Sequence, residues 1–239
     1  MQTSFREIKK QIKSSEKIIL NDSSILSYGS NRVCYLDESN PSKIIKVARH
    51  PESWKKDHRQ SFSEWYVSKS IASTNSDCLI SQCQSWVRTN KGPGLVVERI
   101  VDDHGQSITL RKLLFRRELN VERALLLVEK IIYNFSVNGV PASDFNIDNF
   151  VIEGEHANNK LVMIDGFSPK KINLKTWLLL HSKILSNRYT KRKWRQTKTR
   201  FTYCAQKVYA GDYNFAAAMP LSGASKGSPS IKPSCSNIN

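Results

Sequence analysis

Two short segments near the middle of the chain combine acidic and amide side chains in a spacing that suits phosphoryl transfer. SDFNIDNFVI, at 143–152, contains Asp144 and Asn149, and LVMIDG, at 161–166, contains Asp165. Phosphoryl transfer needs one carboxylate to orient the attacking hydroxyl, and an amide and a second carboxylate to hold magnesium. The Asp and the Asn have the separation found in the protein-kinase catalytic loop. Asp144 is therefore the candidate base, and Asn149 and Asp165 are the candidate metal ligands.

A lysine and a glutamate upstream could complete such a site. Lys46 lies in the predicted strand KIIKV, at 43–47, and its amine could pair with phosphate oxygens and with a carboxylate. Glu64, in the helix predicted next, is the candidate carboxylate. Each could equally be a surface residue facing water, and the three loop residues above could be ordinary turn or capping residues. The shared order along the chain, from strand lysine to post-strand aspartate, is what favours a nucleotide site.

The first half of the chain is predicted to form a sheet with one helix. Residues 16–49 contain β-rich runs interrupted by the turn-forming DESNPS at 37–42, which predicts two or three antiparallel strands with a hairpin there. An apolar stripe in the segment that follows predicts a helix, through Phe62, Trp65, Tyr66 and Ile71. Two further strands are predicted in CLISQCQSWVRT and GPGLVVERIV. The sum is an antiparallel sheet of five strands.

The second half is predicted to be mostly helical. The helical periodicity covers four segments, 107–118, 120–138, 174–185 and 187–208. Between them, FVIEG and KLVMID predict a strand pair around the GEHANN turn, which brings Asn149 and Asp165 to neighbouring ends of one hairpin. From Gly211 onward the chain is rich in Ser, Gly, Pro and Asn, which predicts a disordered tail.

The net charge of +16 over 239 residues is unusual, and the cations are concentrated. Between Asp165 and Asp212 there is no acidic residue, whereas twelve lysines and arginines fall in that interval. Such a block attracts polyanions, so residues 188–200 could bind nucleic acid, anionic lipid or a charged glycan. The same block could instead be a solvated helix face that aids solubility.

Cysteine, histidine and hydropathy patterns exclude several classes of protein. The five cysteines form no CxxC pair, and the five histidines are scattered, which argues against a disulfide framework or a zinc site. No apolar run approaches the ~20 residues that a membrane-spanning helix needs. The first residues are polar and amphipathic, without a signal-peptide core. We therefore expect a cytoplasmic protein with no transmembrane segment.

Several segments together resemble the PhoP-regulatory-network YrbL family of bacterial protein-kinase-like proteins. They are LSYGSNRVCY, KIIKVARH, GLVVERIVDDHGQSITL, DFNIDN and NLKTWLLLHSKILSNRYTKRKW, and the resemblance runs from about residue 20 to 205. It implies an α+β, minimal two-lobed kinase-like fold, with an antiparallel five-strand sheet plus helix as N-lobe and a reduced, mostly helical C-lobe. The expected division is a basic arm at 1–16, the N-lobe at 17–100, the C-lobe at 101–210 and the tail at 211–239.

The resemblance also implies roles for the candidate residues. Lys46 would hold the α and β phosphates of ATP, Glu64 would anchor it, and Asp144 would be the catalytic base. Asn149 and Asp165 would bind Mg²⁺. Adenine would meet backbone groups around Glu98 and Ile100, in a hinge near 98–101, and Gly29 and Cys34 would line the top of the site.

Four features depart from the kinase pattern. Ser27 and Arg32 stand where the phosphate-covering loop commonly has glycine, Asn146 replaces a lysine, and Asp-Gly-Phe at 165–167 replaces Asp-Phe-Gly. Loss of the loop lysine removes a charge that would steady the transferring phosphoryl group, so slow turnover is expected.

Three functional hypotheses from different classes follow. The first is an ATP- and Mg²⁺-dependent phosphotransferase whose acceptor is a small molecule, a glycan or the protein itself. The second is a pseudokinase that binds nucleotide to regulate a partner. The third is an adaptor that binds a polyanion through the basic C-terminal helix. The sequence does not fix the oligomeric state.

Overall fold

The protein is described here by a computed structural model that covers residues 2–29, 31–49, 54–72, 77–154, 160–169 and 173–215. Most of the predicted tail, 216–239, and most of the GEHANN turn lie outside these described residues. No helix in the described ranges is both long and apolar enough to cross a membrane.

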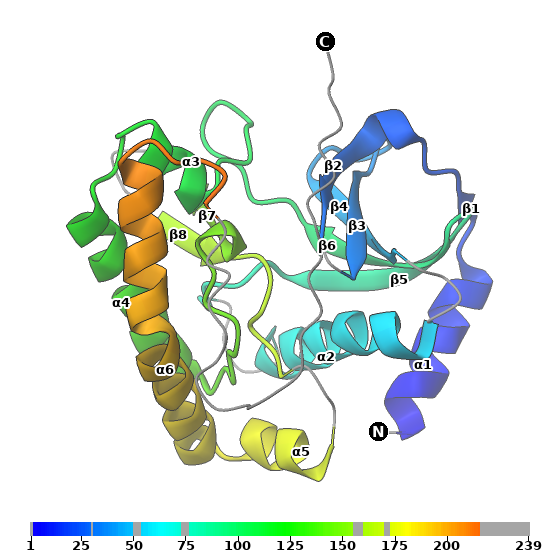
Figure 1. Ribbon diagram of the computed structural model, residues 1–239. Coiled ribbons are helices and arrows are strands. Elements are labelled where there is room, and N and C mark those ends of the chain that lie inside the picture. Colours follow the sequence, from blue (N-terminus) through cyan, green and yellow to red (C-terminus); the bar gives the residue numbers. More distant parts are fainter. Residues whose placement is uncertain are drawn as a thin grey trace, which may run out of the picture.

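The fold is α+β. Six strands form one curled sheet in the order β1-β5-β6-β4-β3-β2, and two more form a hairpin in the other half of the molecule (Figure 1). The strands of the sheet are β1 (Lys17–Ile18), β2 (Ile25–Tyr28), β3 (Arg32–Leu36), β4 (Lys43–Ala48), β5 (Cys83–Thr89) and β6 (Gly92–Glu98). The hairpin consists of β7 (Phe150–Glu153) and β8 (Lys160–Met163). The helices are α1 (Gln2–Ser14), α2 (Trp54–Ala72), α3 (Leu110–Phe115), α4 (Val121–Asn138), α5 (Leu174–His181) and α6 (Lys183–Tyr209).

The predicted five-strand antiparallel sheet needs a correction. The sheet has six strands and is mixed, because the two-residue edge strand β1 pairs in parallel with β5. A strand of two residues is too short to produce an alternating pattern, so no local pattern predicts it. The hairpin predicted at 37–42 is confirmed, since β3 and β4 pair antiparallel on either side of it.

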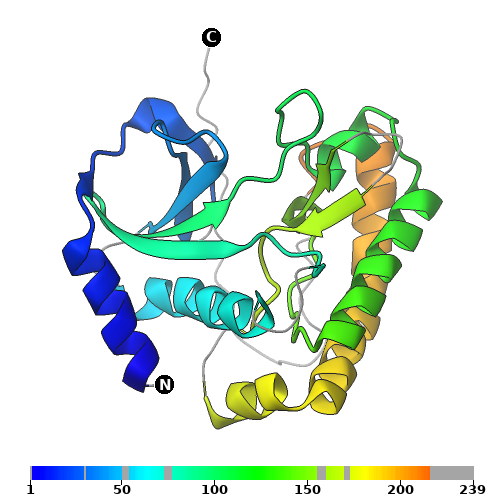
Figure 2. The ribbon, with the colours of Figure 1, turned by 180° about the vertical axis from the view of Figure 1, so that it is seen from behind.

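The residues expected as a basic arm form α1, which packs along β5 (Figure 2). Its residue Ile8 is buried in the main core. The side chains of Gln11 and Ser15 accept hydrogen bonds from the backbone N–H groups of Trp86 and Arg88, at 2.9 Å each. These bonds lie on the side of β5 that only the short strand β1 covers, so α1 and the residue after it complete this edge of the sheet.

The side chains on the two faces of the sheet pack into two separate hydrophobic cores. Along β4, Ile45 and Val47 pack with Val96 of β6 in a small cluster enclosed by the curl of the sheet. The residues that alternate with these on each strand, such as Leu95 of β6, face the main core. This core continues through α2 into the helical half. This period of two is the reason why Lys46, between Ile45 and Val47, points toward α2.

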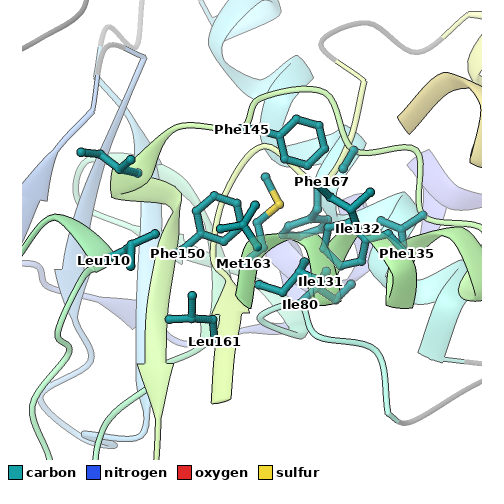
Figure 3. Packing of buried hydrophobic residues seen from close by; sticks show 14 of the residues in the cluster. Ile80, Leu110, Ile131, Ile132, Phe135, Phe145, Phe150, Leu161, Met163 and Phe167 are labelled. Carbon is teal, nitrogen blue, oxygen red and sulfur yellow. The ribbon is translucent and has the colours of Figure 1, made fainter. Parts of the chain in front are cut away.

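The two halves of the molecule share one continuous core (Figure 3). The segment before β5 pairs with β8: the Ser81 N–H donates to Met163 O, and the Met163 N–H donates to Leu79 O, both at 3.0 Å. Ile80 thereby packs among the core residues Phe150 and Met163, as Figure 3 shows. The hairpin that carries the candidate metal ligands is thus fixed to the sheet by backbone as well as by apolar contacts.

Local signals set the boundaries of the helices that support the hairpin. Asn120 caps the start of α4 by accepting a hydrogen bond from the Arg123 N–H, and Gly139 ends the helix in a left-handed conformation, φ 72°. The predicted helix at 120–138 is therefore confirmed almost to the residue. The helices predicted at 174–185 and 187–208 exist as α5 and α6, but the break between them was predicted four residues too late: it lies at Ser182, which caps α6.

The contact between α1 and β5 makes a testable prediction. Gln11→Ala should lower the free energy of unfolding by about 1 kcal/mol, because the Trp86 N–H then loses its partner. Urea denaturation measures this. Lys10→Ala, at an exposed position of the same helix, is the control and should change little. Equal stability of the two variants would show that the Gln11 hydrogen bond contributes nothing.

Candidate functional site

The structure brings Lys46, Glu64 and Asp165 together in a cluster of charges between the sheet and the hairpin. Lys46 comes from β4, Glu64 from α2, and Asp165 from the loop directly after β8. Lys46 Nζ lies 3.4 Å from Glu64 Oε2 and donates a 2.7 Å hydrogen bond to the Ile164 carbonyl, next to Asp165. Lys46 and Glu64 are buried, whereas a third of the Asp165 side chain is exposed (33%).

Arg32 joins the two carboxylates of this cluster. Its guanidinium pairs with both oxygens of Glu64, at 2.7 Å each, and Nη2 also contacts Asp165 Oδ2 at 2.6 Å. The side chain is 3% exposed. A planar guanidinium suits this paired geometry, whereas an ammonium offers a single point charge. In this structure Arg32, rather than Lys46, is thus the main partner of Glu64.

Both oxygens of Asp165 have partners. Oδ2 contacts Arg32, while Oδ1 accepts hydrogen bonds from Gln60 Nε2 at 2.8 Å and from the Gly166 N–H at 2.6 Å. Burial by itself raises the pKa of the Asp165 carboxyl, but Arg32 and Lys46 outweigh burial and hold this pKa well below its usual range. Asp165 is therefore ionised at neutral pH, as a cation ligand must be.

The remaining ionisable groups respond to their burial in different ways. Burial raises the pKa of Glu64, against the opposing charge of Arg32, and the nearby Asp165 charge raises it further. Burial lowers the pKa of Lys46, but the charge of Glu64 outweighs this and the net shift is upward. Lys46 consequently stays protonated, and the cluster holds two cations against two carboxyl groups.

The loop that contains Asp144 touches the end of the hairpin. Asn149 Nδ2 donates a 2.9 Å hydrogen bond to the Asp144 carbonyl, and the Asp144 N–H donates to Gly166 O at 3.2 Å. The Ile164 N–H donates to Asn149 O at 2.8 Å, which confirms that Asn149 and Asp165 lie at neighbouring ends of β7 and β8. The Asp144 side chain itself is exposed and forms no ion pair with any described residue.

Gly166 sits where the two loops meet. Its φ is +78°, and a Cβ added there would lie 2.7 Å from both Asp144 Cβ and Asp144 O, and 3.1 Å from Asn149 Nδ2. Only glycine accepts this conformation and this close approach. The glycine that directly follows Asp165 therefore lies against Asp144 and Asn149, so the loop of the candidate base and the segments of both candidate metal ligands meet at this residue.

Gly29 lies in the turn between β2 and β3, and Cys34 lies on β3, close to the charge cluster. Gly29 closes the turn between β2 and β3 by donating its N–H to Arg32 O at 2.7 Å. Cys34 is half-buried and pairs directly with Lys46 across β3 and β4. Both predicted positions are thus next to the charge cluster or to the strand that contains Arg32.

The predicted adenine-binding residues lie elsewhere. Glu98 and Ile100 line a cavity of about 440 Å³, which is walled on its other sides by residues 77–82 and by parts of β7 and β8. The Glu98 N–H donates to Gln82 O, and Glu98 O accepts from Ser81 Oγ. Lys46 and Cys34 are not among the residues that line this cavity. Glu98 and Ile100 therefore line this cavity without the Lys46 side of the charge cluster.

Sequence reasoning missed Arg32 and Gln60 as members of the site. Arg32 was noted only as a departure from glycine, yet a signal was present: it is two residues before Cys34, and residues two apart on a strand share a face. Gln60, four residues before Glu64, lies on the same side of α2. Asn146 also has a local role, since its side chain accepts a hydrogen bond from the Asp148 N–H and caps the turn at 147–149.

The donor atoms fit magnesium only in part. Because Asn149 Nδ2 is used by Asp144 O, Asn149 Oδ1 is the atom left to meet a cation, and oxygen donors are what Mg²⁺ prefers. In the described parts of the chain no group of three or more His, Cys, Asp or Glu side chains could hold a metal by itself. A magnesium ion here would need phosphate oxygens as further ligands, as is usual in nucleotide sites.

Gly166→Ala tests the contact between the two loops. The new Cβ would clash with Asp144 at a positive φ, so we expect a loss of roughly 1–3 kcal/mol in unfolding free energy. Gly105→Ala is a matched control, because Gly105 has a similar φ of +72° but nothing within 4 Å of an added Cβ. Thermal and urea unfolding measure both variants. A cost for Gly166→Ala no larger than that for Gly105→Ala would contradict the steric argument.

Comparison with known proteins identifies the family. No curated protein matches the chain. Among solved structures, a crystal structure of WbdD at 2.2 Å has a TM-score of 0.41 and 12% sequence identity, over 78% of this chain. The matched part is 49% of that chain, so this protein spans about half of its length. Residues 18–201 match the family described as PhoP regulatory network protein YrbL, and the chain belongs to that family.

Proposed function

We propose that the protein is an ATP- and Mg²⁺-dependent phosphotransferase that uses the Lys46, Glu64 and Asp165 cluster and the adjoining Asp144 loop. The observation that carries the proposal is the convergence of these groups: a buried, protonated lysine and an ionised aspartate lie beside an exposed aspartate that has no ion-pair partner in the described chain. Phosphoryl transfer requires little more than such positioning and electrostatics.

Each residue has a role that follows from its surroundings. Lys46, held by Glu64 and the Ile164 carbonyl, supplies a fixed positive charge for phosphate oxygens. Asp144, exposed at the end of the loop, can approach the hydroxyl of an acceptor and take its proton. Asn149 Oδ1 and Asp165 would hold magnesium. When bound, the metal would neutralise the charge on the transferred phosphoryl group.

The proposal also covers the phosphoryl acceptor and the location of the protein in the cell. We favour a small molecule, a glycan or the protein itself as acceptor. We also propose a cytoplasmic location, where ATP and magnesium are both abundant.

Substitution of the two aspartates tests the mechanism. Asp144→Asn should reduce autophosphorylation or ATP hydrolysis by roughly 10²–10⁴-fold while nucleotide binding persists, because only the base is lost. Asp165→Asn should remove both the activity and the magnesium dependence of nucleotide binding. Radiolabelled ATP measures activity, and a nucleotide-induced thermal shift measures binding.

Asp22→Asn is the control for that experiment, since Asp22 is exposed and pairs with Lys91 at the far edge of the sheet. It should retain full activity. Undiminished turnover in Asp144→Asn would rule out the mechanism, and the absence of any thermal shift with magnesium and ATP would rule out a nucleotide site.

Arg32 favours a second candidate function, a nucleotide-binding regulator without transfer. Its guanidinium lies 2.6 Å from Asp165 Oδ2, in the place where a metal ligand must be open. A positive charge there competes directly with magnesium. Because Arg32 also holds both oxygens of Glu64, it can release Asp165 without leaving the cluster. In this second candidate function, Arg32 keeps its contact with Asp165 when nucleotide binds, and no phosphoryl group is transferred.

Magnesium titration of an Arg32 variant tests whether Arg32 competes with magnesium for Asp165. Arg32→Gln should lower the magnesium concentration needed for a half-maximal nucleotide thermal shift by about tenfold, which corresponds to 1.4 kcal/mol of lost competition. The variant should also lose stability, roughly 3–5 kcal/mol, because Glu64 loses its main partner, so the titration needs a low starting temperature. Gln60→Ala, which removes an uncharged contact of Asp165, is the control. A magnesium requirement that is unchanged or higher in Arg32→Gln would show that Arg32 does not compete with the metal.

A further inference from the structure

Large apolar side chains are exposed on α5 and the start of α6. They are Leu174 (72% exposed), Trp177 (40%), Leu178 (43%), Ile184 (67%) and Leu185 (41%); we call them the α5 patch. Within α5, Leu174, Trp177 and Leu178 are spaced three and four residues apart, which places them on one face of the helix. The opposite face is already used, because Thr176 and Leu179 are buried. Among the described residues, the ring of His181 stacks on Trp177, with 4.4 Å between the ring centroids, and the five side chains of the patch still keep 40–72% of their surface exposed.

The patch is surrounded by cations. Lys175, Lys183 and Arg188 are exposed beside it, and Lys191 and Arg192 continue the series one turn further along α6. The interval 166–211 contains no acidic residue at all. Figures 1 and 2 show α5 and the first turns of α6 at the same end of the molecule, away from β2.

We propose that the α5 patch docks on a membrane surface that contains anionic lipid. Leucine, isoleucine and tryptophan side chains that project from short helices can enter the boundary between headgroups and acyl chains, while neighbouring lysines and arginines pair with the headgroups. Tryptophan is especially suited to this boundary. The protein would lie on the membrane and would not span it.

Charge complementarity distinguishes this partner from others. Two copies of the chain that met through their α5 patches would bring two sets of cations together with no acid between them, which is repulsive. A nucleic acid would match the cations but leave the aliphatic side chains in water. The apolar residues on α4 form a useful contrast: Leu126 is 54% exposed, but Glu122 and Glu129 lie on the same helix.

Vesicle flotation of the full chain tests the proposal. The protein should float with phosphatidylcholine vesicles that contain phosphatidylglycerol and should stay behind with phosphatidylcholine alone. Binding should weaken at about 1 M salt, where charge interactions are screened within ~3 Å. Tryptophan fluorescence should shift to the blue with anionic vesicles, and Trp177→Ser should reduce that shift.

Two variants and two controls complete the design. Leu174→Ser with Leu178→Ser should reduce binding at least tenfold, and Lys175→Gln with Lys183→Gln should reduce it about fivefold for each charge removed. Leu126→Ser and the pair Lys112→Gln with Arg123→Gln change exposed residues elsewhere and should leave binding within twofold. All changed residues are exposed, so unaltered thermal unfolding is expected.

Several outcomes would overturn the proposal. They are no binding to anionic vesicles, equal binding to neutral vesicles, and binding that the α5 patch variants do not change. Self-association that Leu174→Ser with Leu178→Ser abolishes, together with no flotation, would assign the patch to a second copy of the chain. Selective binding of an acidic peptide without flotation would assign it to a protein partner.

Discussion

The contact of one buried guanidinium with two carboxylates organises this molecule. Arg32 is on β3, Glu64 on α2 and Asp165 after β8, so this one side chain ties together the sheet, its covering helix and the hairpin of the helical half. Buried charges are costly unless they are paired and hydrogen-bonded. The positions of all three elements are therefore constrained by the need of Arg32 and Glu64 to remain matched.

The main core reinforces this constraint. It runs without interruption from Trp65 and Leu95 on the sheet side to Phe135 and Phe167 on the helical side. The backbone bonds between residues 79–81 and β8 lie in the same region. Close packing transmits displacements, so a shift of the hairpin would be felt at α2. The candidate site thus lies on rigid supports, which is what a preorganised arrangement of charges requires.

Much of this arrangement is readable in the sequence because periodicity and turn residues are local signals. The strand of Lys46, the hairpin at 37–42 and the long helices were predicted from alternation, from DESNPS and from the helical pattern. The pairing of β7 with β8 followed from two short strands around one turn. Glu64 was found because a helix directly follows the lysine strand.

What could not be predicted depends on contacts between distant segments. Strand β1 exists because β5 offers it an edge, and nothing in two residues reveals that. Arg32 was compared with a glycine pattern and so treated as a defect, although its contact with Asp165 spans 133 positions of the chain. The cavity beside Glu98 likewise depends on residues 77–82 and on the hairpin. Ion pairs between residues far apart in the sequence depend on the fold, and no local motif predicts them.

The closure of the β5 edge by α1 has a consequence for the order of assembly. Gln11 and Trp86 are 75 positions apart, and Ser15 and Arg88 are 73 apart. During synthesis at about 5–20 residues per second, the helix must wait several seconds before its partner strand leaves the ribosome. Until then its apolar side, with Ile8, has nothing native to cover. A nascent chain of this protein therefore exposes the apolar side of α1 until β5 has been made, and during that interval the helix is accessible to chaperones.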